Sequence, residues 1–375
     1  MSIENGGGWF VLSIIFKKRK FPFCALFLLF EVVYFPIASA DEVKSSLSPI
    51  EISEKEAVHK SYAHFLEEIR KEALAKHLAS SSTVDYALSF SKKQPYPNKT
   101  IISHDRNQPE FHWSWKTYRD NVISPMRLKQ GCEEWSKNKK TLQKISELYG
   151  GVDPHIILGI WGIESHFGDV EGKHNVFAAL STLAFDGRRS EFFRRELLAA
   201  LEIAGKGDIS PSKMTSSYAG AMGQAQFMPT AYMHFATTGH VRGFFHPRYP
   251  NIWRNKQDVL NSIANYMQKS GWDHKTRWGE PVKISSYVGE VKTFPGTENY
   301  STAPRHKLSE WENLGVYPVS GNHFLSPDLI GILFQPEGSK GESFMLYPNF
   351  RVIMRYNPSE FYALAAALLG DLSDP

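Results

Sequence analysis

The chain has 375 residues, of which 42% are hydrophobic, 13% are aromatic and only two are cysteines. This length corresponds to one large domain or two ordinary ones, and the apolar fraction is enough for a hydrophobic core, which excludes a disordered tail protein. Two cysteines exclude both a disulfide framework and a cysteine-rich zinc module. Lysine and arginine number 43 and acidic residues 39, so the formal net charge is only +4.

The first forty residues have the layout of a secretory signal peptide. Four basic residues at 17–20 precede an apolar run at 21–37, and small residues follow at 38–40. A membrane-spanning helix is the alternative, but two prolines and a glutamate make this run shorter and more polar than a good bilayer span. We therefore expect residues 1–40 to be a signal peptide and the mature chain to begin near Asp41.

Removal of this segment changes what the net charge implies. It would leave 39 basic and 37 acidic residues, a net charge of +2. No stripe of Lys and Arg with interleaved aromatic residues remains, so the charge gives no support for nucleic-acid binding. Cys132 would be the only cysteine of the mature chain, and we expect it to be a small buried apolar residue without a disulfide partner.

Helical spacing of apolar residues dominates the first part of the mature chain. Residues 53–78 carry apolar side chains at roughly helical spacing with charges between them, which predicts an exposed amphipathic helix. From 125 to 272 the pattern is again mainly helical, and few β-like runs interrupt it.

The pattern changes near residue 281. Short β-branched or aromatic runs at 282–288, 329–334 and 350–355, separated by Gly and Pro, predict strands. A last helix at 359–369 is rich in alanine and suited to close packing. We predict an α+β, predominantly α, fold in which a small β-containing subdomain is inserted before a C-terminal helix that rejoins the helical body. The expected divisions are a signal peptide at 1–40, an N-terminal helical and linker region at 41–108, an α-helical domain at 109–280, a β-containing subdomain at 281–350, and a C-terminal segment with its helix at 351–375.

One predicted helix carries a carboxyl group near its end. Pro154 near its start and Gly168 after its last turn are helix start and stop signals, so Glu164 lies in the last turn of an almost wholly apolar helix. Apolar surroundings and the negative end of the helix dipole both raise the pKa of a carboxyl group. A carboxylic acid that is protonated near neutral pH can act as a general acid on a glycosidic oxygen. The alternative is a glutamate that only closes the helix end.

Two glycines inside the same helix, Gly159 and Gly162, favour a special role for it. A glycine inside a helix costs about 1 kcal/mol relative to alanine. It usually reflects the close approach of another group, which we expect here.

A second constellation covers residues 217–229 and reads Ser-Tyr-Ala-Gly-Ala-Met-Gly-Gln-Ala-Gln-Phe-Met-Pro. Its small residues leave room for a backbone or a ligand to approach. Ser217, Gln224 and Gln226 offer neutral hydrogen-bonding groups, which suit the hydroxyl and N-acetyl groups of a sugar. A tight helix-packing seam is the alternative, and the glutamines among the small residues favour a ligand wall.

Four sequence blocks follow one another along the chain. They are Gly-Ile-Glu-Ser-His-Phe-Gly around Glu164, the block at 217–229, Ala264-Asn265-Tyr266 with Gly271-Trp272, and Arg355-Tyr356-Asn357 with Tyr362. In this order they resemble the membrane-bound lytic murein transglycosylase B family, from about Pro109 to Leu369. The resemblance implies a lysozyme-like catalytic body of SLT type, corresponding to the α-helical domain at 109–280.

The resemblance also implies a reaction. The family cleaves the β-1,4 bond between N-acetylmuramic acid and N-acetylglucosamine in peptidoglycan. Glu164 would be its single acid/base: it would protonate the leaving oxygen and then take the proton of the muramoyl 6-hydroxyl, which attacks the anomeric carbon and leaves a 1,6-anhydro end. This reaction explains why no second carboxylate is evident, since the substrate supplies the nucleophile and its N-acetyl group the electrostatic support.

Further roles are implied by the same resemblance. Ser217 would orient Glu164, and Asn357 would lie close to the reacting ring. Four tyrosines would face the sugar or support the site, and the alternative is that they are half-buried core residues. Two arginines would meet stem-peptide carboxylates, and the alternative is that they are solvated surface charges. The expected substrate-binding residues are Gln226, Tyr118, Tyr266, Tyr356, Tyr362, Gln224, Arg188 and Arg189.

Two departures from the family pattern affect these expectations. Residues 237–243 lack the carboxylates that a calcium loop requires, so we expect no calcium. His240 and His246 are not at a recognisable zinc spacing, and we expect no other metal and no cofactor. Phe192 stands where relatives often have tyrosine, which removes a hydroxyl from that subsite.

The leading hypothesis is therefore a periplasmic lytic transglycosylase, acting as a monomer on peptidoglycan glycan strands. A lysozyme-type peptidoglycan hydrolase that uses the same acid is the first alternative, and it would need a second carboxylate to hold a water. A non-catalytic peptidoglycan-binding protein is the second, and the presence of both Glu164 and Ser217 argues against it.

Overall fold

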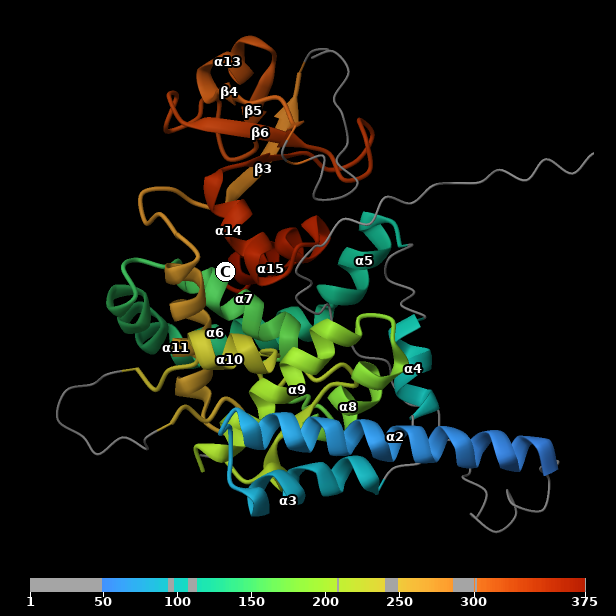
Figure 1. The fold of residues 1–375 in the computed structure, drawn as a ribbon. Helices are drawn as coiled ribbons and strands as arrows, with labels where there is room; N and C mark the ends of the chain where they lie inside the picture. The colour runs from blue at the N-terminus through green and yellow to red at the C-terminus, as the bar shows by residue number, and fades with distance from the viewer. Residues whose placement is uncertain are drawn as a thin grey trace, which may run out of the picture.

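The computed structural model shows a helical body with a small β subdomain at one end (Figure 1). The predicted α+β, predominantly α, fold class is confirmed. Across the described part of the chain, no helix combines the length and the apolar character needed to cross a membrane. The expected signal peptide lies outside the described residues, which are 49–93, 98–106, 113–207, 209–239, 249–285, 300 and 302–374.

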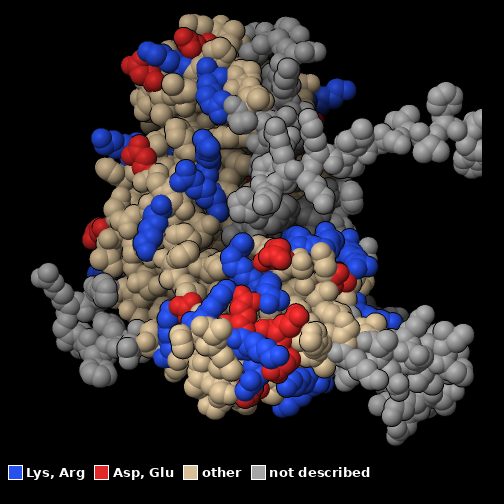
Figure 2. Space-filling view, in the orientation of Figure 1, with Lys and Arg blue, Asp and Glu red and all other residues tan. Residues whose placement is uncertain are grey.

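Three helices precede the body, and the first of them is the predicted amphipathic helix. Its apolar stripe, which includes Tyr62, Ile69 and Ala73, is buried. The Tyr62 hydroxyl shares a 2.6 Å hydrogen bond with the Ser181 hydroxyl of the body. On the face seen in Figure 2, basic and acidic side chains are interspersed over these helices. The three helices are α2 (Pro49–Ala75), α3 (Ser81–Lys92) and α4 (Lys99–Arg106).

The body surrounds one buried helix, α7 (Pro154–Ser165). Every residue from Ile156 to Ser165 is buried, as the lack of a polar face in this stretch predicts. Asp153 caps its start by accepting a hydrogen bond from the His155 backbone N–H at 2.9 Å. The other helices of the body are α5 (Trp115–Val122), α6 (Pro125–Leu148), α8 (Val176–Asp186), α9 (Ser190–Gly205), α10 (Pro229–Phe235), α11 (Lys256–Lys269), α14 (Pro348–Tyr356) and α15 (Glu360–Leu372), with a short 3-10 helix, η2 (Pro211–Lys213). The main neighbours of α7 among them are α6, α11 and α15.

The β subdomain is a five-stranded antiparallel sheet with the strand order β4-β6-β7-β3-β5. In its centre Leu346 is paired with Gly279 on one side and with Ile332 on the other. A small core that includes Trp311 and Met345 lies against the sheet, separate from the core of the body. The elements are β3 (Gly279–Ile284), β4 (His306–Lys307), α13 (Leu308–Asn313), β5 (Val316–Pro318), β6 (Ile330–Phe334) and β7 (Phe344–Leu346); a two-stranded pair in the body is formed by β1 (His174–Asn175) and β2 (Thr215–Ser216).

One predicted strand is wrong. Residues 350–355 lie in helix α14, which Pro348 opens from its first turn. Phe350, Ile353 and Met354 are buried, a spacing of three and four residues that matches one face of a helix. A six-residue apolar run does not by itself distinguish a strand from a buried helix, so the β-branched content was misleading here.

Helices α7 and α15 cross with their backbones in direct contact. A Cβ atom at Gly159 would lie 1.9 Å from the Ala366 carbonyl oxygen, and one at Gly370 would lie 2.0 Å from the His155 carbonyl oxygen. A Cβ at Gly162 would meet the Phe167 ring at 2.5 Å. The close approach expected at Gly159 and Gly162 is therefore confirmed.

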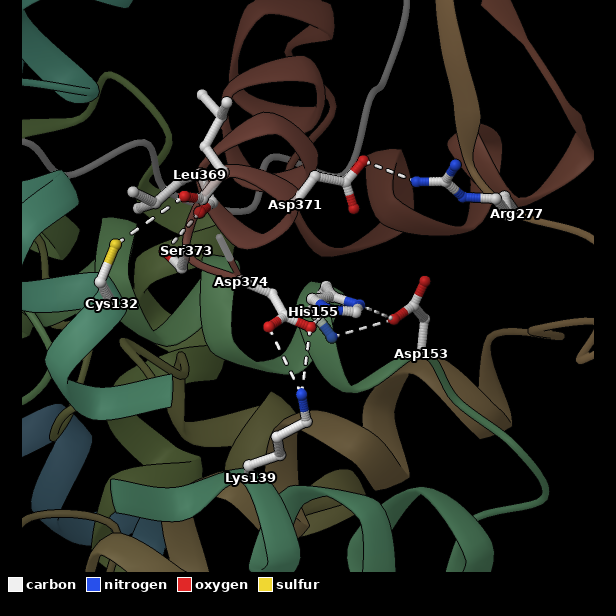
Figure 3. A network of polar contacts seen from close by, with 10 residues as sticks. Cys132, Lys139, Asp153, His155, Arg277, Leu369, Asp371, Ser373 and Asp374 are labelled. Atoms are coloured by element: carbon white, nitrogen blue, oxygen red, sulfur yellow. Dashed lines mark hydrogen bonds and ion pairs between the residues drawn. The ribbon is translucent and has the colours of Figure 1, made fainter. Parts of the chain in front are cut away.

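A polar network holds the end of the chain beside the start of α7 (Figure 3). His155 stacks on the Trp135 ring, with the centroids 4.3 Å apart, and shares hydrogen bonds with Asp153 Oδ1 at 2.9 Å and Asp374 Oδ2 at 3.3 Å. Lys139 contacts the same Asp374 carboxylate. Burial alone lowers the pKa of His155, but the neighbouring carboxylates outweigh it and raise the pKa above its ordinary value.

Two further residues of α6 and α15 adjoin this network. Asp371 accepts hydrogen bonds from Arg277 at 2.9 Å and from the Trp278 indole at 3.0 Å, which ties the last turn of α15 to the start of β3. Cys132, expected to be buried, is half-buried, because its side of α6 lies at the edge of the contact with α15, where the sulfur is 3.9 Å from the Leu372 carbonyl oxygen.

We predict that Gly159→Ala lowers the free energy of unfolding by about 2 kcal/mol or more, because the new methyl group would force α7 and α15 apart. Urea denaturation followed by circular dichroism measures this loss. Gly321→Ala is the matched control, since a Cβ there meets its nearest atom at 3.9 Å. Equal stabilities of the two variants would contradict the close crossing.

We also predict that the His155 network stabilises the fold most at low pH. Because the His155 pKa is raised above 6.5, the stabilisation is complete below that pH and is lost as the pH rises through the folded-state pKa. Urea unfolding of the wild type and His155→Gln from about pH 5 to about pH 9 should show a stability difference that shrinks with rising pH. A difference that grows with pH would refute the assignment.

Candidate active site

Glu164 lies in the last turn of α7, where the helix ends in an uncommon backbone conformation. His166 and Phe167 both have positive φ, 48° and 56°, and Gly168 follows at 92°. Consecutive left-handed residues other than glycine are costly and are found mainly where function requires them. The chain thus turns sharply away directly after the carboxyl group, which is itself only 7% exposed.

The environment of Glu164 keeps its carboxyl group protonated at neutral pH. Burial raises its pKa to about 8, against a smaller lowering by the hydrogen bond from Tyr362. The Tyr362 hydroxyl donates this bond to Glu164 Oε1 at 2.5 Å. Burial also raises the pKa of Tyr362 well above its ordinary value, so this hydroxyl stays a donor over the whole range in which Glu164 titrates.

Tyrosines of α11, α14 and α15 form a buried layer beside this pair. The Tyr362 ring stacks on Tyr356 at 6.5 Å with an interplanar angle of 7°, and Tyr356 packs on Tyr266 at 4.7 Å. The Tyr356 hydroxyl donates to the Ala225 carbonyl at 2.5 Å, and the Tyr266 hydroxyl donates to the Arg355 carbonyl at 2.6 Å. All three rings are buried, so their arrangement fits the support of the site and not the stacking of a sugar.

Tyr118 is also a buried ring that packs against other aromatic side chains. It is buried on α5 between Trp115, at 6.3 Å, and Phe361 of α15, at 5.8 Å. After burial, which is the largest cause, Tyr118 is one of the groups that raise the pKa of Tyr362. It therefore stands behind the donor to Glu164, and a sugar-stacking role is not supported.

Other parts of the protein fill most of the space beside the small residues at 217–229. A Cβ at Gly220 would meet the Leu180 side chain at 2.3 Å, and one at Gly223 would meet the Ile252 carbonyl oxygen at 2.6 Å. The Ser217 hydroxyl accepts a hydrogen bond from the Ala221 N–H at 3.1 Å, which closes a turn of this loop. These positions match the packing-seam alternative, and a contact of Ser217 with Glu164 stays a prediction.

The two glutamines of the loop differ. Gln224 is buried, and its amide is used at both ends: Oε1 accepts from the Trp161 indole at 3.0 Å and Nε2 donates to the Trp253 carbonyl at 3.0 Å. The structure thus gives Gln224 a bracing role in place of the expected sugar contact. Gln226 is half-buried, has a positive φ of 48° and donates to the Gly223 carbonyl at 2.7 Å. Its contact with the muramoyl unit stays a prediction.

The expected peptide-binding arginines are engaged by the protein. Arg188 Nε donates to Asp105 Oδ2 at 2.8 Å, and Arg189 pairs with the other oxygen of the same buried carboxylate. These ion pairs join α4 to the start of α9, and the two guanidinium groups supply the positive charge that balances the buried Asp105 carboxylate. The Arg188 and Arg189 side chains are still 50% and 32% exposed. Their contact with stem-peptide carboxylates stays a prediction, in which the substrate carboxylate would have to compete with Asp105.

Along the chain, Asn357 and Glu360 lie between Tyr356 and Tyr362. Asn357 is buried; its Oδ1 accepts from the Ser359 N–H at 3.1 Å, and its Nδ2 has no hydrogen-bond partner among the residues described. Glu360 is 7% exposed, and burial raises its pKa to about 7. Its Oε1 likewise lacks a partner within the described ranges.

Glu360 was not identified from the sequence. An acid in the first turn of a helix is common, because the helix dipole favours it there, so the position carries no distinguishing signal. Within the described residues, no three His, Cys, Asp or Glu side chains are placed to hold a metal ion. The segment 237–243, in which calcium was not expected, lies partly outside the described residues.

Comparisons with known proteins identify the family of this chain. Residues 61–371 match the family model described as Transglycosylase SLT domain. The membrane-bound lytic murein transglycosylase B of Escherichia coli (strain K12) is 33% identical over 264 residues, which cover 68% of this chain and 66% of that protein.

Solved structures with the same fold include two from Pseudomonas aeruginosa. SltB3 from Pseudomonas aeruginosa in complex with NAG-NAM-pentapeptide has a TM-score of 0.71 and 35% identity, covering 83% of this chain and 79% of that chain. Soluble lytic transglycosylase SltB1 from the same organism has a TM-score of 0.67 and 30% identity, covering 82% and 97%. The chain belongs to the transglycosylase SLT domain family.

Proposed function

We propose that this protein is a lytic transglycosylase that cleaves the β-1,4 bond between N-acetylmuramic acid and N-acetylglucosamine in peptidoglycan. The observation that carries the proposal is the buried Glu164 carboxyl, with a pKa of about 8 and the Tyr362 hydroxyl 2.5 Å away. The complexes of relatives with NAG-NAM-pentapeptide and NAG-anhNAM-pentapeptide support the substrate class and the anhydro product.

In the proposed reaction Glu164 works first as an acid. Its carboxyl group is protonated at neutral pH and donates that proton to the glycosidic oxygen as the bond to the anomeric carbon breaks. The positive charge that develops at the anomeric carbon is supported by the N-acetyl group of the substrate. The Tyr362 hydroxyl stabilises the carboxylate that remains, because a hydrogen bond to the charged form lowers its free energy.

Glu164 then works as a base. The carboxylate takes the proton of the muramoyl 6-hydroxyl, whose oxygen attacks the anomeric carbon and closes the 1,6-anhydro ring. The proton lost in the first step is regained in the second, so the enzyme returns to its starting state and no water is consumed. A single carboxyl group whose pKa lies near the working pH suits both steps.

Ser217, Asn357 and Gln226 complete the proposed site. The unpaired Nδ2 of buried Asn357 supports a role for it beside the substrate, because a buried donor without a partner is costly unless a ligand satisfies it. The positive φ of Gln226 supports a functional role at that position. We propose that the enzyme is exported to the periplasm and acts there on glycan strands.

A lysozyme-type hydrolase is the second candidate, and Glu360 is the observation that favours it. Hydrolysis needs a second carboxyl group to activate a water, and Glu360 is a buried carboxyl two residues before Tyr362. The two reactions differ by one water in the mass of the product, which makes them easy to distinguish.

We expect the mature protein to release muropeptides with 1,6-anhydro ends from purified sacculi, detected by mass spectrometry. Glu164→Gln should lower the rate about 1000-fold, since it removes the transferable proton while keeping the shape. Asp371→Asn, which neutralises a half-buried carboxyl group at the far end of α15, is the matched control and should retain activity. Products with reducing ends would overturn the transglycosylase assignment in favour of the hydrolase.

The pH dependence should respond to Tyr362. Tyr362→Phe removes the hydrogen bond that lowers the Glu164 pKa. The high-pH limb of the rate profile should therefore shift to higher pH by about one unit, while the maximal rate falls. Tyr232→Phe removes a buried hydroxyl that donates to the Pro250 carbonyl and should leave the limb in place. Coincident profiles for Tyr362→Phe and the wild type would rule out this role.

A further inference from the structure

The β subdomain contacts the catalytic body through helix α5. The connection between β6 and β7, residues 335–343, carries Glu337 and Glu342, and both carboxylates contact the first turns of α5. Figure 1 shows α5 beside α15, on the side of the body that faces the β subdomain. This contact is the starting point of the inference.

Three polar contacts join the connection to α5. Glu342 Oε2 accepts a hydrogen bond from the Trp115 indole at 2.8 Å, and its Oε1 pairs with Arg119 Nη1 at 2.7 Å. Glu337 Oε1 accepts a hydrogen bond from the Lys116 backbone N–H at 2.8 Å. The first N–H groups of a helix have no partner within it, and its dipole favours negative charge there, so two carboxylates suit this end of α5.

The connection is built to hold these carboxylates in place. Gln335 Nε2 donates to the Ser343 hydroxyl at 2.7 Å across its base. Between them, the Gly338 N–H donates to the Gln335 carbonyl at 3.1 Å and the Gly341 N–H donates to the Gly338 carbonyl at 3.1 Å. The loop therefore has its own hydrogen bonds and presents both carboxylates from a folded turn.

The other end of α5 is held by a positive charge. The buried Arg127 guanidinium donates to the Val122 carbonyl at the last residue of the helix. A cation at the C-terminus and carboxylates at the N-terminus both complement the helix dipole. Helix α5 has only eight residues, so tertiary contacts such as these decide where it lies.

Helix α5 in turn supports the donor to the catalytic carboxyl. Its Trp115 and Tyr118 rings pack on Phe361 with centroids 5.5 Å and 5.8 Å away. Phe361 immediately precedes Tyr362 in the first turn of α15. A shift of α5 would therefore move the wall against which Tyr362 rests.

We propose that Glu342, together with Glu337, is a positioning residue that couples the β subdomain to the active site by fixing α5. The β subdomain then acts as a brace of the catalytic wall and is not a separate binding module. This inference rests on the proposed function, because the group that it positions is the donor to Glu164.

The competing explanation is an ordinary surface ion pair. The Arg119 and Glu342 side chains are 37% and 45% exposed, and such pairs contribute little to stability. If the pair were of this kind, its removal would change neither the local unfolding of α5 nor the rate of the chemical step. These two quantities therefore separate the explanations.

The test uses Glu342→Gln and Glu342→Ala in the full mature chain. Amide hydrogen exchange should become about tenfold faster in residues 115–122 of both variants, as the hydrogen bonds to a charged acceptor are lost. On soluble glycan strands kcat should fall about tenfold while KM stays within about twofold, because α5 stands behind the acid and not against the sugar. Asp328→Asn is the matched control: it breaks a 2.9 Å ion pair with Lys307 in the same subdomain and should change neither quantity.

Trp115→Phe provides a second route if Glu342→Ala does not fold, because it removes the same hydrogen bond from the other partner. The double variant with Glu342→Gln should lose no more activity than the worse single variant. Faster exchange without a change in kcat, or unchanged exchange, would overturn the positioning role. Wild-type products without anhydro ends would overturn the proposed reaction only, since the exchange measurement needs no product.

Discussion

The direct backbone contact between α7 and α15 is the constraint on which the rest of the site depends. Glycines at 159 and 370 allow the two helices to approach until carbonyl groups of one lie against Cα atoms of the other. One helix carries Glu164 and the other Tyr362, and the crossing brings their oxygens to 2.5 Å. The His155 network holds the opposite end of the same pair of helices, so the geometry of the Glu164–Tyr362 contact is a property of the core packing.

Burial of Glu164 is both a cost to folding and the source of its chemistry. A desolvated carboxylate would need several donors, and among the described residues Tyr362 is the one that donates to it. The protonated form therefore prevails at neutral pH, with a pKa of about 8. The hydrogen bond from Tyr362 stabilises the carboxylate form, as the proposed reaction requires of an acid that later acts as a base. The β subdomain contributes by bracing the wall behind that donor.

How far the sequence predicts the site depends on the range of the interactions involved. Glu164 could be located because helix start and stop signals and a continuous apolar run are local features. Gly159 could be singled out because it conflicts with helix propensity. The role of Gln224 could not, because its two partners lie 63 and 29 residues away along the chain. The pairing of Arg188 with Asp105 could not be predicted for the same reason, since Asp105 lies 83 residues before it.

By itself the sequence determined a mostly helical fold, a buried helix ending in a carboxyl group, and membership of a family recognisable from four ordered blocks. Only the tertiary structure decided which polar groups are paired inside the protein and which remain for a ligand. It showed that the four tyrosines are buried, that burial raises the pKa of Glu360 as well as that of Glu164, and that a loop of the β subdomain contacts the start of α5. The physical reason is that periodicity and propensity act between near neighbours, whereas desolvation and pairing are set by whichever distant segments the fold brings together.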